Sequence, residues 1–337
     1  MLLTLEDLKS QMRATDRLLV VADNCTDDTA AVAVAAGAEV VDRNDPEKRG
    51  KGYALDCGLK HLSAAPPDTV IFIDADCRLA DHLIDRLAAV CAATNRPVQA
   101  LYLMMTPKGS PIKSRVAEFA WRVKNSVRPS GLGALGLPCQ LMGTGMAFPW
   151  DVIRRVNLAS GAIVEDMKLG IDLALAGNPP LFCSSTVITS DFPSSAEGIQ
   201  SQRLRWEHGH IAMIFAAAPR LICAAIMRGN VNLLALALDL AVPPLSLLGM
   251  LVIGIFLASS LAAWLGTSPS AMMISTVVLV EFTGGVLVSW LRCGRDILPP
   301  RVFLSVVSYA IQKLPVYGQF FSRKAISEWV RTDRRKG

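Results

Sequence analysis

Charged and aromatic residues are scarce in this sequence, at 19% and 6% of its 337 residues. Residues 245–265 hold no charged side chain at all. Hydrophobic residues make up 52% of the chain and the mean hydropathy is +0.38, which excludes a purely soluble protein. Because uncharged stretches of about 20 apolar residues are typical of membrane spans, we expect part of the chain to lie in lipid.

Paired cysteines, sequence repeats and a secretory signal are also lacking. The 8 cysteines stand singly, without the close pairs that zinc sites and redox motifs need, so we expect reduced structural thiols in a cytosolic domain. Charged side chains interrupt residues 1–13, where a signal peptide would have an apolar core. The absence of repeats argues against a solenoid.

The net charge of +5 is modest, and basic residues gather in residues 292–337. A basic segment next to apolar stretches suits anionic lipid better than nucleic acid. We therefore expect membrane lipid as a partner, and no nucleic acid.

Short apolar runs and helical stretches alternate in the first part of the chain. The expected strands lie at 17–22, 39–42, 69–73 and 97–104, and the expected helices at 4–12, 26–36, 52–62 and 81–93. Strand, helix and strand in succession predict a parallel α/β sheet of the Rossmann nucleotide-binding type. We expect this domain to fill residues 1–230 and a membrane region to fill 231–337.

Two carboxylates, Asp74 and Asp76, directly follow one of the expected strands. They should emerge at the carboxyl edge of the sheet, where such sheets bind ligands. Close carboxylates there can hold a hard divalent cation, Mg²⁺ or Mn²⁺, against a diphosphate. A carboxylate pair that caps the next helix would give the same pattern.

Asp23 and Lys51 extend this group of polar residues. Asp23 ends an earlier strand, where its carboxylate can accept a hydrogen bond from a nucleobase. Lys51 lies between glycines, so its ammonium can meet a phosphate beside flexible backbone. An Asx turn at Asp23 and a solvated loop at Lys51 are the alternatives.

Asp166 is the candidate general base, because it lies at the start of a helical stretch. The positive end of the helix dipole keeps a carboxylate ionised and able to take a proton from an acceptor hydroxyl. Further on, Gln202 and Arg205 could hold a departing diphosphate while Trp206 stacks on a sugar. For the nearby histidines, 208 and 210, a structural or interfacial role is favoured over metal binding, since no third ligand is evident.

The order of these groups resembles glycosyltransferase family 2, in particular its membrane-bound branch with cellulose, chitin and hyaluronan synthases, over about residues 16–210. The resemblance implies a nucleotide-diphospho-sugar transferase fold of the GT-A kind followed by transmembrane helices. It implies donor binding by Asp23, Lys51, Asp74, Gln202 and Arg205, metal binding by Asp76, and catalysis by Asp166. It assigns the acceptor to Gly143, Thr144, Gly145, Glu165 and Trp206.

Two departures from the family pattern stand out. Val164 replaces the threonine of the family's Thr-Glu-Asp signature, which is mild. Family members also begin with an apolar strand and a Pro-x-x-Asn-Glu turn, whereas this chain opens in the helix that should follow them. We expect that the true start lies upstream. The alternative is a degenerate, noncatalytic membrane protein that binds nucleotide or a synthase partner.

The membrane region is expected to contain two spans, 245–265 and 271–291, after an interfacial arm at 233–242. Residues 302–321 are interrupted by polar residues and are expected to form an interfacial helix, with a third span as the alternative. The uncharged loop 266–270 and the basic flanks predict that the catalytic domain and the tail face the cytoplasm. The expected location is the inner membrane, with several passes.

The hypothesis from the sequence is a single-displacement, inverting transfer of a sugar from a UDP-sugar. The acceptor is a saccharide or a lipid-linked molecule, and exopolysaccharide or envelope glycan synthesis is the implied role. Partners in polysaccharide synthesis or export would follow from that role.

Overall fold

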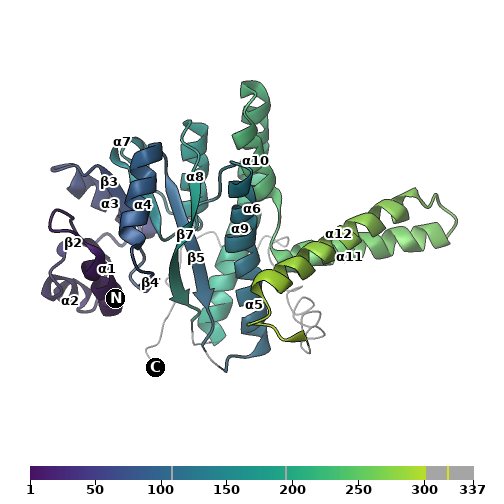
Figure 1. The fold of residues 1–337 in the computed structure, drawn as a ribbon, viewed down its shortest axis with the longest axis horizontal. Coiled ribbons are helices and arrows are strands. Elements are labelled where there is room, and N and C mark those ends of the chain that lie inside the picture. The colour runs from purple at the N-terminus through teal and green to yellow at the C-terminus, as the bar shows by residue number, and fades with distance from the viewer. Residues whose placement is uncertain (108, 194–195, 301–316, 319–337) are drawn as a thin grey trace. The chain divides into compact units, whose positions relative to one another are not determined.

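The computed structural model describes residues 1–107, 109–193, 196–300 and 317–318 (Figure 1). The chain forms two compact units, and each is described by itself. The first unit contains Met1–Met105 and Arg128–Ala241, and the second contains Thr106–Val127 and the described residues after Ala241. A division of function at residue 230 remains a prediction.

The first unit begins with alternating helices and strands, as the sequence predicts. The elements are α1 (Leu2–Gln11), β1 (Leu19–Asp23), α2 (Thr29–Ala35), β2 (Glu39–Arg43) and α3 (Lys51–Leu62). β1 and β2 pair in parallel, with Asp23 beside Arg43 at their carboxyl ends. Gly37, at a φ of 79°, makes the left-handed turn between α2 and β2 that residues with a side chain rarely adopt.

A second sheet follows, and it is mixed rather than wholly parallel. Its order is β3 (Thr69–Phe72), β6 (Met146–Pro149), β5 (Val98–Met105), β7 (Leu181–Asp191) and β4 (Arg78–Leu79). Only β5 and β7 pair in parallel, while β6 lies antiparallel to both β3 and β5. The expectation of a purely parallel sheet is wrong here, because a strand from much later in the chain inserts between β3 and β5.

Helices α4 (Leu83–Thr94), α7 (Trp150–Ile153) and α8 (Glu165–Leu175) accompany this sheet (Figure 1). The core between sheet and helices is apolar: Phe148 and Leu173 are fully buried, and the rings of Phe72 and Phe148 lie 5.1 Å apart. Burying each such side chain contributes about 1.5–3 kcal/mol. This packing holds the end of β3 and the start of α8 in place.

Three helices complete the first unit: α6 (Arg128–Ala134), α9 (Ala196–Arg228) and α10 (Val231–Ala241). Leu221 of α9 and Leu236 of α10 are buried in one cluster that also includes residues of α8. Arg128 of α6 forms an ion pair with Asp239 of α10, with 2.6 Å between the charged atoms. The segment expected as an interfacial arm is therefore a helix packed on α9.

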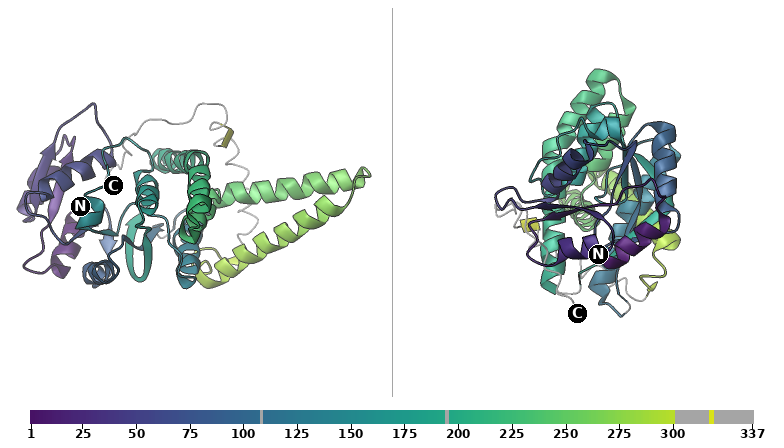
Figure 2. Two further views of the ribbon diagram at one scale, coloured as in Figure 1. Left: turned by 90° about the horizontal axis from the view of Figure 1, so that it is seen from above. Right: turned by 90° about the vertical axis from the view of Figure 1, so that its left-hand side faces the viewer.

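The second unit contains α5 (Ile112–Arg122), a π-helical turn η1 (Val123–Val127), α11 (Leu245–Trp264) and α12 (Ser270–Cys293). α11 and α12 run side by side as a hairpin (Figure 2), and the hydroxyls of Ser259 and Ser275 hydrogen bond across it at 2.7 Å. Phe119 of α5 packs against Trp290 of α12.

Three of the described helices are long and apolar enough to cross a membrane: Leu204–Arg228, Leu245–Trp264 and Ser270–Cys293. The last two match the expected spans and bury only 6% of their apolar windows inside the protein. The first, within α9, buries 33% because it packs against α8 and α10. The expected helix at 302–321 lies outside the described residues, apart from 317–318.

Candidate active site

Lys51 lies where three segments of the first unit meet. It is the first residue of α3, and its Nζ donates hydrogen bonds to the Asp74 carboxylate and, at 2.7 Å, to the carbonyl oxygen of Gly143. The backbone N–H of Asp74 in turn donates to the Thr144 hydroxyl at 3.0 Å. One ammonium group therefore joins the start of α3 to the end of β3 and to the loop of Gly143, Thr144 and Gly145.

Gly52 fixes the position of α3 at this point. A Cβ atom on Gly52 would lie 2.5 Å from the carbonyl oxygen of Leu158 and 2.6 Å from that of Ser160. Only glycine allows this approach of helix and loop. The loop leads directly into α8, so the contact sets the separation between Lys51 and the carboxylates at the start of α8.

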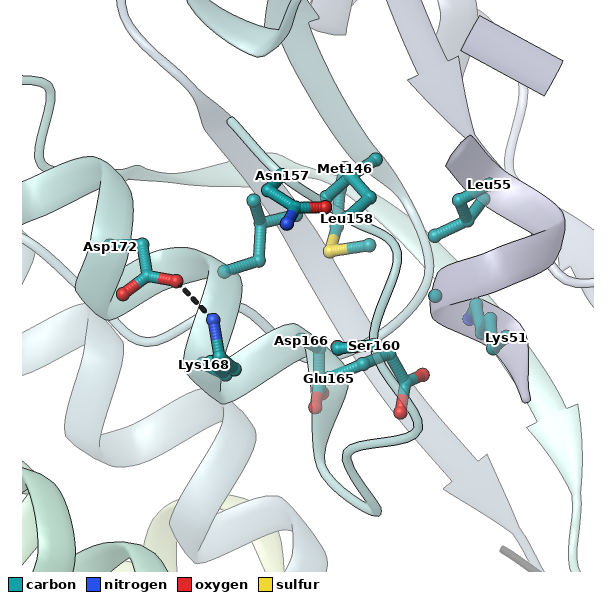
Figure 3. A pocket seen from close by; sticks show the side chains of 12 residues that line it. Lys51, Leu55, Met146, Asn157, Leu158, Ser160, Glu165, Asp166, Lys168 and Asp172 are labelled. Carbon is teal, nitrogen blue, oxygen red and sulfur yellow. Dashed lines mark hydrogen bonds and ion pairs between the residues drawn. The ribbon is translucent and has the colours of Figure 1, made fainter. Parts of the chain in front are cut away.

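Glu165 and Asp166 occupy the first turn of α8 and face α3 across a pocket (Figure 3). A Cβ atom on Gly143 would lie 3.4 Å from the Asp166 carboxylate and 3.9 Å from the Lys51 ammonium. Asp166 and Lys51 therefore both lie close to the same glycine. The pocket is lined by Lys51, Gly52, Leu55, Met146, Asn157, Leu158, Ser160, Glu165, Asp166, Lys168, Leu169 and Asp172.

The charges in this pocket are coupled. Burial opposes the charge on Lys51, but the carboxylates of Asp74, Glu165 and Asp166 outweigh it and raise the pKa of Lys51 above its usual range. Burial and the neighbouring carboxylate of Asp166 raise the pKa of Glu165 to about 7, although Lys51 opposes the shift. One ammonium thus faces three acidic groups. A bound cation, or the loss of the contact between Lys51 and Asp74, would change the net charge around these groups.

The part of α9 around Gly209 lies against the start of α8. A Cβ atom on Gly209 would be 2.7 Å from the side chain of Val164, the residue before Glu165. Arg205 lies one helical turn earlier on the same side of α9, and its guanidinium interacts electrostatically with Glu165. The structure therefore brings Arg205 near Glu165 at the start of α8.

The neighbouring residues of α9 have mixed environments. Gln202 is buried and Trp206 is half-buried. His208 is also buried, and His210 hydrogen bonds to the carbonyl oxygen of Leu240 at 3.1 Å. The contact of His210 with α10 fits the structural role expected for the histidines.

Asp23 has a partner that the sequence reasoning missed. Its carboxylate accepts hydrogen bonds from Arg43 and from the side-chain amide of Asn24. The Arg43 guanidinium also lies 5.6 Å from the ring centre of Tyr53 in α3, two residues after Lys51. The signal was the register of the two parallel strands, which places residues 23 and 43 side by side.

Asp76 is exposed in the loop after β3. Among the residues that the structure describes, no three His, Cys, Asp or Glu side chains form a group that could hold a metal ion by themselves. Magnesium is commonly bound by one or two carboxylates together with substrate phosphates. Asp76, with Asp74, would supply the carboxylates for such a cation, and a bound diphosphate and water would supply its other ligands.

Cys77, next to Asp76, is a structural residue. Its thiol is buried and lies 3.4 Å from the Thr144 hydroxyl. Burial, together with the negative charge of Asp74, raises the pKa of Cys77 to about 12. The thiol is therefore neutral at physiological pH, and it supports the loop rather than supplying a nucleophile.

Comparison with known proteins defines the class. The profile described as "Glycosyltransferase like family 2" matches residues 2–209, which is more than half of the chain, so the chain belongs to this family. It has a GT-A-like nucleotide-sugar transferase fold. Its place in the membrane-bound branch of synthases remains a prediction.

Individual relatives resemble the chain to different extents. Over 66 residues it is 44% identical to glucosyl-3-phosphoglycerate synthase of Mycolicibacterium paratuberculosis, and the match spans 18% of this chain and 19% of that protein. The fold is similar to a mannosyltransferase of Pyrobaculum calidifontis, solved with GDP-Man and Mn²⁺, at a TM-score of 0.52 and 17% identity over 94% of this chain and 82% of that one. Glucosyl-3-phosphoglycerate synthase of Mycobacterium tuberculosis gives a TM-score of 0.34 at 22% identity, over 56% and 65% of the two chains.

Proposed function

We propose that the chain is an inverting glycosyltransferase that moves a sugar from a nucleotide diphosphate donor to a saccharide or lipid-linked acceptor. The observation that carries the proposal is the position of the Lys51 ammonium, which contacts Asp74 and lies near Asp166 beside Gly143. A cation that can meet a diphosphate and a carboxylate that can take a proton are thus adjacent. Single-displacement transfer uses a base for the attacking hydroxyl and positive charge that stabilises the departing diphosphate.

On the donor side, Asp23 and Asp74 bind the nucleotide and Asp76 holds a divalent cation. The similar mannosyltransferase was solved with GDP-Man and Mn²⁺, which supports Mn²⁺ as a cofactor and makes GDP-sugars as well as UDP-sugars candidate donors. We propose a UDP-sugar, as the sequence predicts. When bound, the cation offsets negative charge on the diphosphate.

During transfer, Asp166 accepts the proton of the attacking acceptor hydroxyl. Lys51 and Arg205 stabilise the charge that develops on the departing diphosphate, and Gln202 assists them. Lys51 exchanges its contact with Asp74 for one with phosphate when the donor enters. Attack from the side opposite the leaving group inverts the anomeric carbon.

On the acceptor side, Trp206 stacks on the sugar and Glu165 accepts a hydrogen bond. The loop of Gly143, Thr144 and Gly145 bounds the space beside Asp166. Gly143 and Gly145 have φ angles of 95° and 65°, so this loop takes a shape that residues with side chains rarely adopt. The same shape keeps side-chain atoms out of the gap between Lys51 and Asp166.

The apolar helices support a membrane protein, and we propose that it lies in the inner membrane with residues 1–230 in the cytoplasm. Donor nucleotides are available on that side. The hairpin of α11 and α12 has too few helices to form a conducting pore by itself, which favours a lipid-linked acceptor over a long polymer. Partners in polysaccharide synthesis or export and a role in envelope glycan assembly belong to this proposal.

The test is a donor screen with the full-length chain. Purified protein in lipid is incubated with Mn²⁺, a membrane lipid extract and one of several radiolabelled UDP- or GDP-sugars, and label transferred to lipid or saccharide is counted. We expect one donor to give turnover, and chelation of the metal to abolish it. A preparation that binds nucleotide but transfers label from no donor would contradict the proposal and favour a noncatalytic nucleotide-binding protein.

A further inference from the structure

Helix α1 presents a polar face to residues 73–83, the segment that follows β3 and carries Asp76. At 3.6 residues per turn, positions three and four residues apart lie on one face of a helix. Thr4, Asp7 and Gln11 have this spacing, and each of them hydrogen bonds to the segment. α1 also packs against β4, the short strand within the segment (Figure 1). One face of α1 therefore holds the segment at three successive points.

The Thr4 hydroxyl binds the peptide group that joins Ala75 to Asp76. It donates a hydrogen bond to the carbonyl oxygen of Ala75 at 2.8 Å. Because the peptide group is planar, a fixed carbonyl oxygen also fixes the direction of the backbone nitrogen of Asp76. Thr4 is only 3% exposed, and a buried donor that loses its partner is costly. The bond therefore restricts rotation of the loop at the residue between Asp74 and Asp76.

Asp7 and Gln11 hold the part of the segment that follows this loop. The Asp7 carboxylate accepts hydrogen bonds from Nε and Nη2 of Arg78 at 2.7 and 2.8 Å, and from the backbone N–H of Leu79 at 3.1 Å. Two bonds from one guanidinium fix its orientation better than a single bond does. The side-chain amide of Gln11 donates to the carbonyl oxygen of Ala80 at 3.2 Å. The segment is therefore anchored to α1 on the carboxyl-terminal side of the loop as well.

Asp74 and Cys77 anchor the loop on the side of the sheet. The N–H of Asp74 donates to the Thr144 hydroxyl at 3.0 Å, and the N–H of Cys77 donates to the carbonyl oxygen of Asp74 at 3.2 Å. Asp76 itself is exposed, so its neighbours hold its backbone while its side chain stays at the surface. Ordering a flexible loop costs conformational entropy, and a loop that is already ordered binds a ligand without that cost. The contacts of α1 thus favour binding at Asp76.

We propose that Thr4 and Asp7 are positioning residues for the divalent cation. They hold the backbone around Asp76, so the orientation of its carboxylate is set before the cation and the diphosphate bind. The inference rests on the proposed function, in which Asp76 with Asp74 supplies the carboxylates for that cation. Groups that orient metal ligands in this indirect way typically change metal affinity about 10- to 100-fold. Removal of the Thr4 hydroxyl should therefore weaken cation binding while both carboxylates remain.

The experiment measures Mn²⁺ binding to the full-length chain in lipid, with saturating UDP or GDP, from the electron paramagnetic resonance signal of free Mn²⁺. Thr4→Val keeps nearly the shape of threonine but has no hydroxyl, and its Kd for Mn²⁺ should rise about tenfold. Thr4→Ser keeps the hydroxyl and should bind Mn²⁺ like wild type. In the transfer assay, Thr4→Val should need about tenfold more Mn²⁺ for half of its maximal rate. Its kcat at saturating Mn²⁺ should equal that of wild type, because no ligand has been removed.

Ser10→Ala is the matched control, because Ser10 is exposed on α1 and its hydroxyl donates to the carbonyl oxygen of Asp7 within the same helix. It should bind Mn²⁺ like wild type. Asp7→Asn weakens the ion pair with Arg78 but keeps Thr4, and it should raise the Kd for Mn²⁺ severalfold. This second variant tests the inference even if Thr4→Val does not fold.

The possible failures can be told apart. Equal Mn²⁺ affinity in Ser10→Ala and in the folded variants of Thr4 and Asp7 would overturn the inference and leave the proposed function intact. A loss of affinity in Thr4→Val that Thr4→Ser shares would overturn the role of the hydroxyl. A wild type that binds no Mn²⁺ with either nucleotide would overturn both the inference and the metal site of the proposed function.

Discussion

Gly52→Ala should destabilise the protein, although alanine normally stabilises a helix relative to glycine by about 0.5–1 kcal/mol. Gly52 is the second residue of α3, and the added Cβ would lie 2.5 Å and 2.6 Å from two backbone carbonyl oxygens. Ordinary van der Waals contact requires most of an ångström more. Backbone atoms on the loop cannot rotate away as a flexible side chain could, so α3 or the loop must shift.

The two effects have opposite signs, and their sizes decide the outcome. Overpacking typically costs about 1–3 kcal/mol, which exceeds the gain in helix propensity. We expect a net loss of about 1–2 kcal/mol, which corresponds to a fall in the midpoint of thermal unfolding of roughly 2–8 °C for a domain of this size. Because Lys51 precedes Gly52, the shift also moves its ammonium, and a misplacement of about 1 Å can lower turnover about a hundredfold.

The assay is thermal unfolding of the full-length protein, combined with transfer of radiolabelled sugar. Gly131→Ala is the control, because Gly131 is also helical but a Cβ there would meet nothing within 4 Å. It should raise the midpoint slightly and leave turnover unchanged. A Gly52→Ala protein as stable and as active as Gly131→Ala would refute the argument that this contact positions Lys51.

Three further predictions concern the charges of the site. Relative to Glu165→Gln, wild type should lose about 2 kcal/mol of folding free energy as the pH rises from 4.5 to 7, because the folded state favours the protonated form of Glu165. Denaturation of both proteins at several pH values measures this loss. A stability difference between them that stays constant with pH would contradict the prediction. Lys51→Met should lower kcat/KM for the donor about a hundredfold, since the surrounding carboxylates lose the positive charge of the Lys51 ammonium. An unchanged kcat/KM would show that Lys51 does not act in the donor site. Arg43→Met should cost about 2 kcal/mol of folding free energy, because the Asp23 carboxylate loses its ion pair with the Arg43 guanidinium. A double-mutant cycle with Asp23→Asn should give a coupling energy between the two residues. If the stability losses of the two single variants simply add in the double variant, the pairing is disproved.

The approach of Lys51, Asp74 and Asp166 could be predicted from the sequence. Asp74 follows an apolar strand and Asp166 begins a helix, and both positions are ones where folds of this kind present ligand-binding groups. The structure brings these residues together around Gly143. The resemblance to a family, rather than periodicity, indicated that segments so far apart in the chain would meet.

Other features could not be predicted. The insertion of β6 between β3 and β5 depends on pairing between distant segments, whereas the alternation of apolar residues reports only that a segment is a strand. The role of Gly52 depends on a contact with Leu158, far along the chain. For residues 204–228 hydropathy could not decide, because packing against α10 and insertion into lipid require the same apolar side chains.

The most direct test of the central claim compares Asp166→Asn with wild type in the transfer assay. The account predicts that turnover falls about 10²- to 10⁴-fold, while the thermal shift on donor binding is kept. Asp151→Asn, a substitution of an exposed carboxylate that pairs with Arg154, should leave turnover unchanged. Undiminished turnover in Asp166→Asn would show that the carboxylate beside Lys51 and Gly143 is not the base, and the proposed mechanism would be wrong.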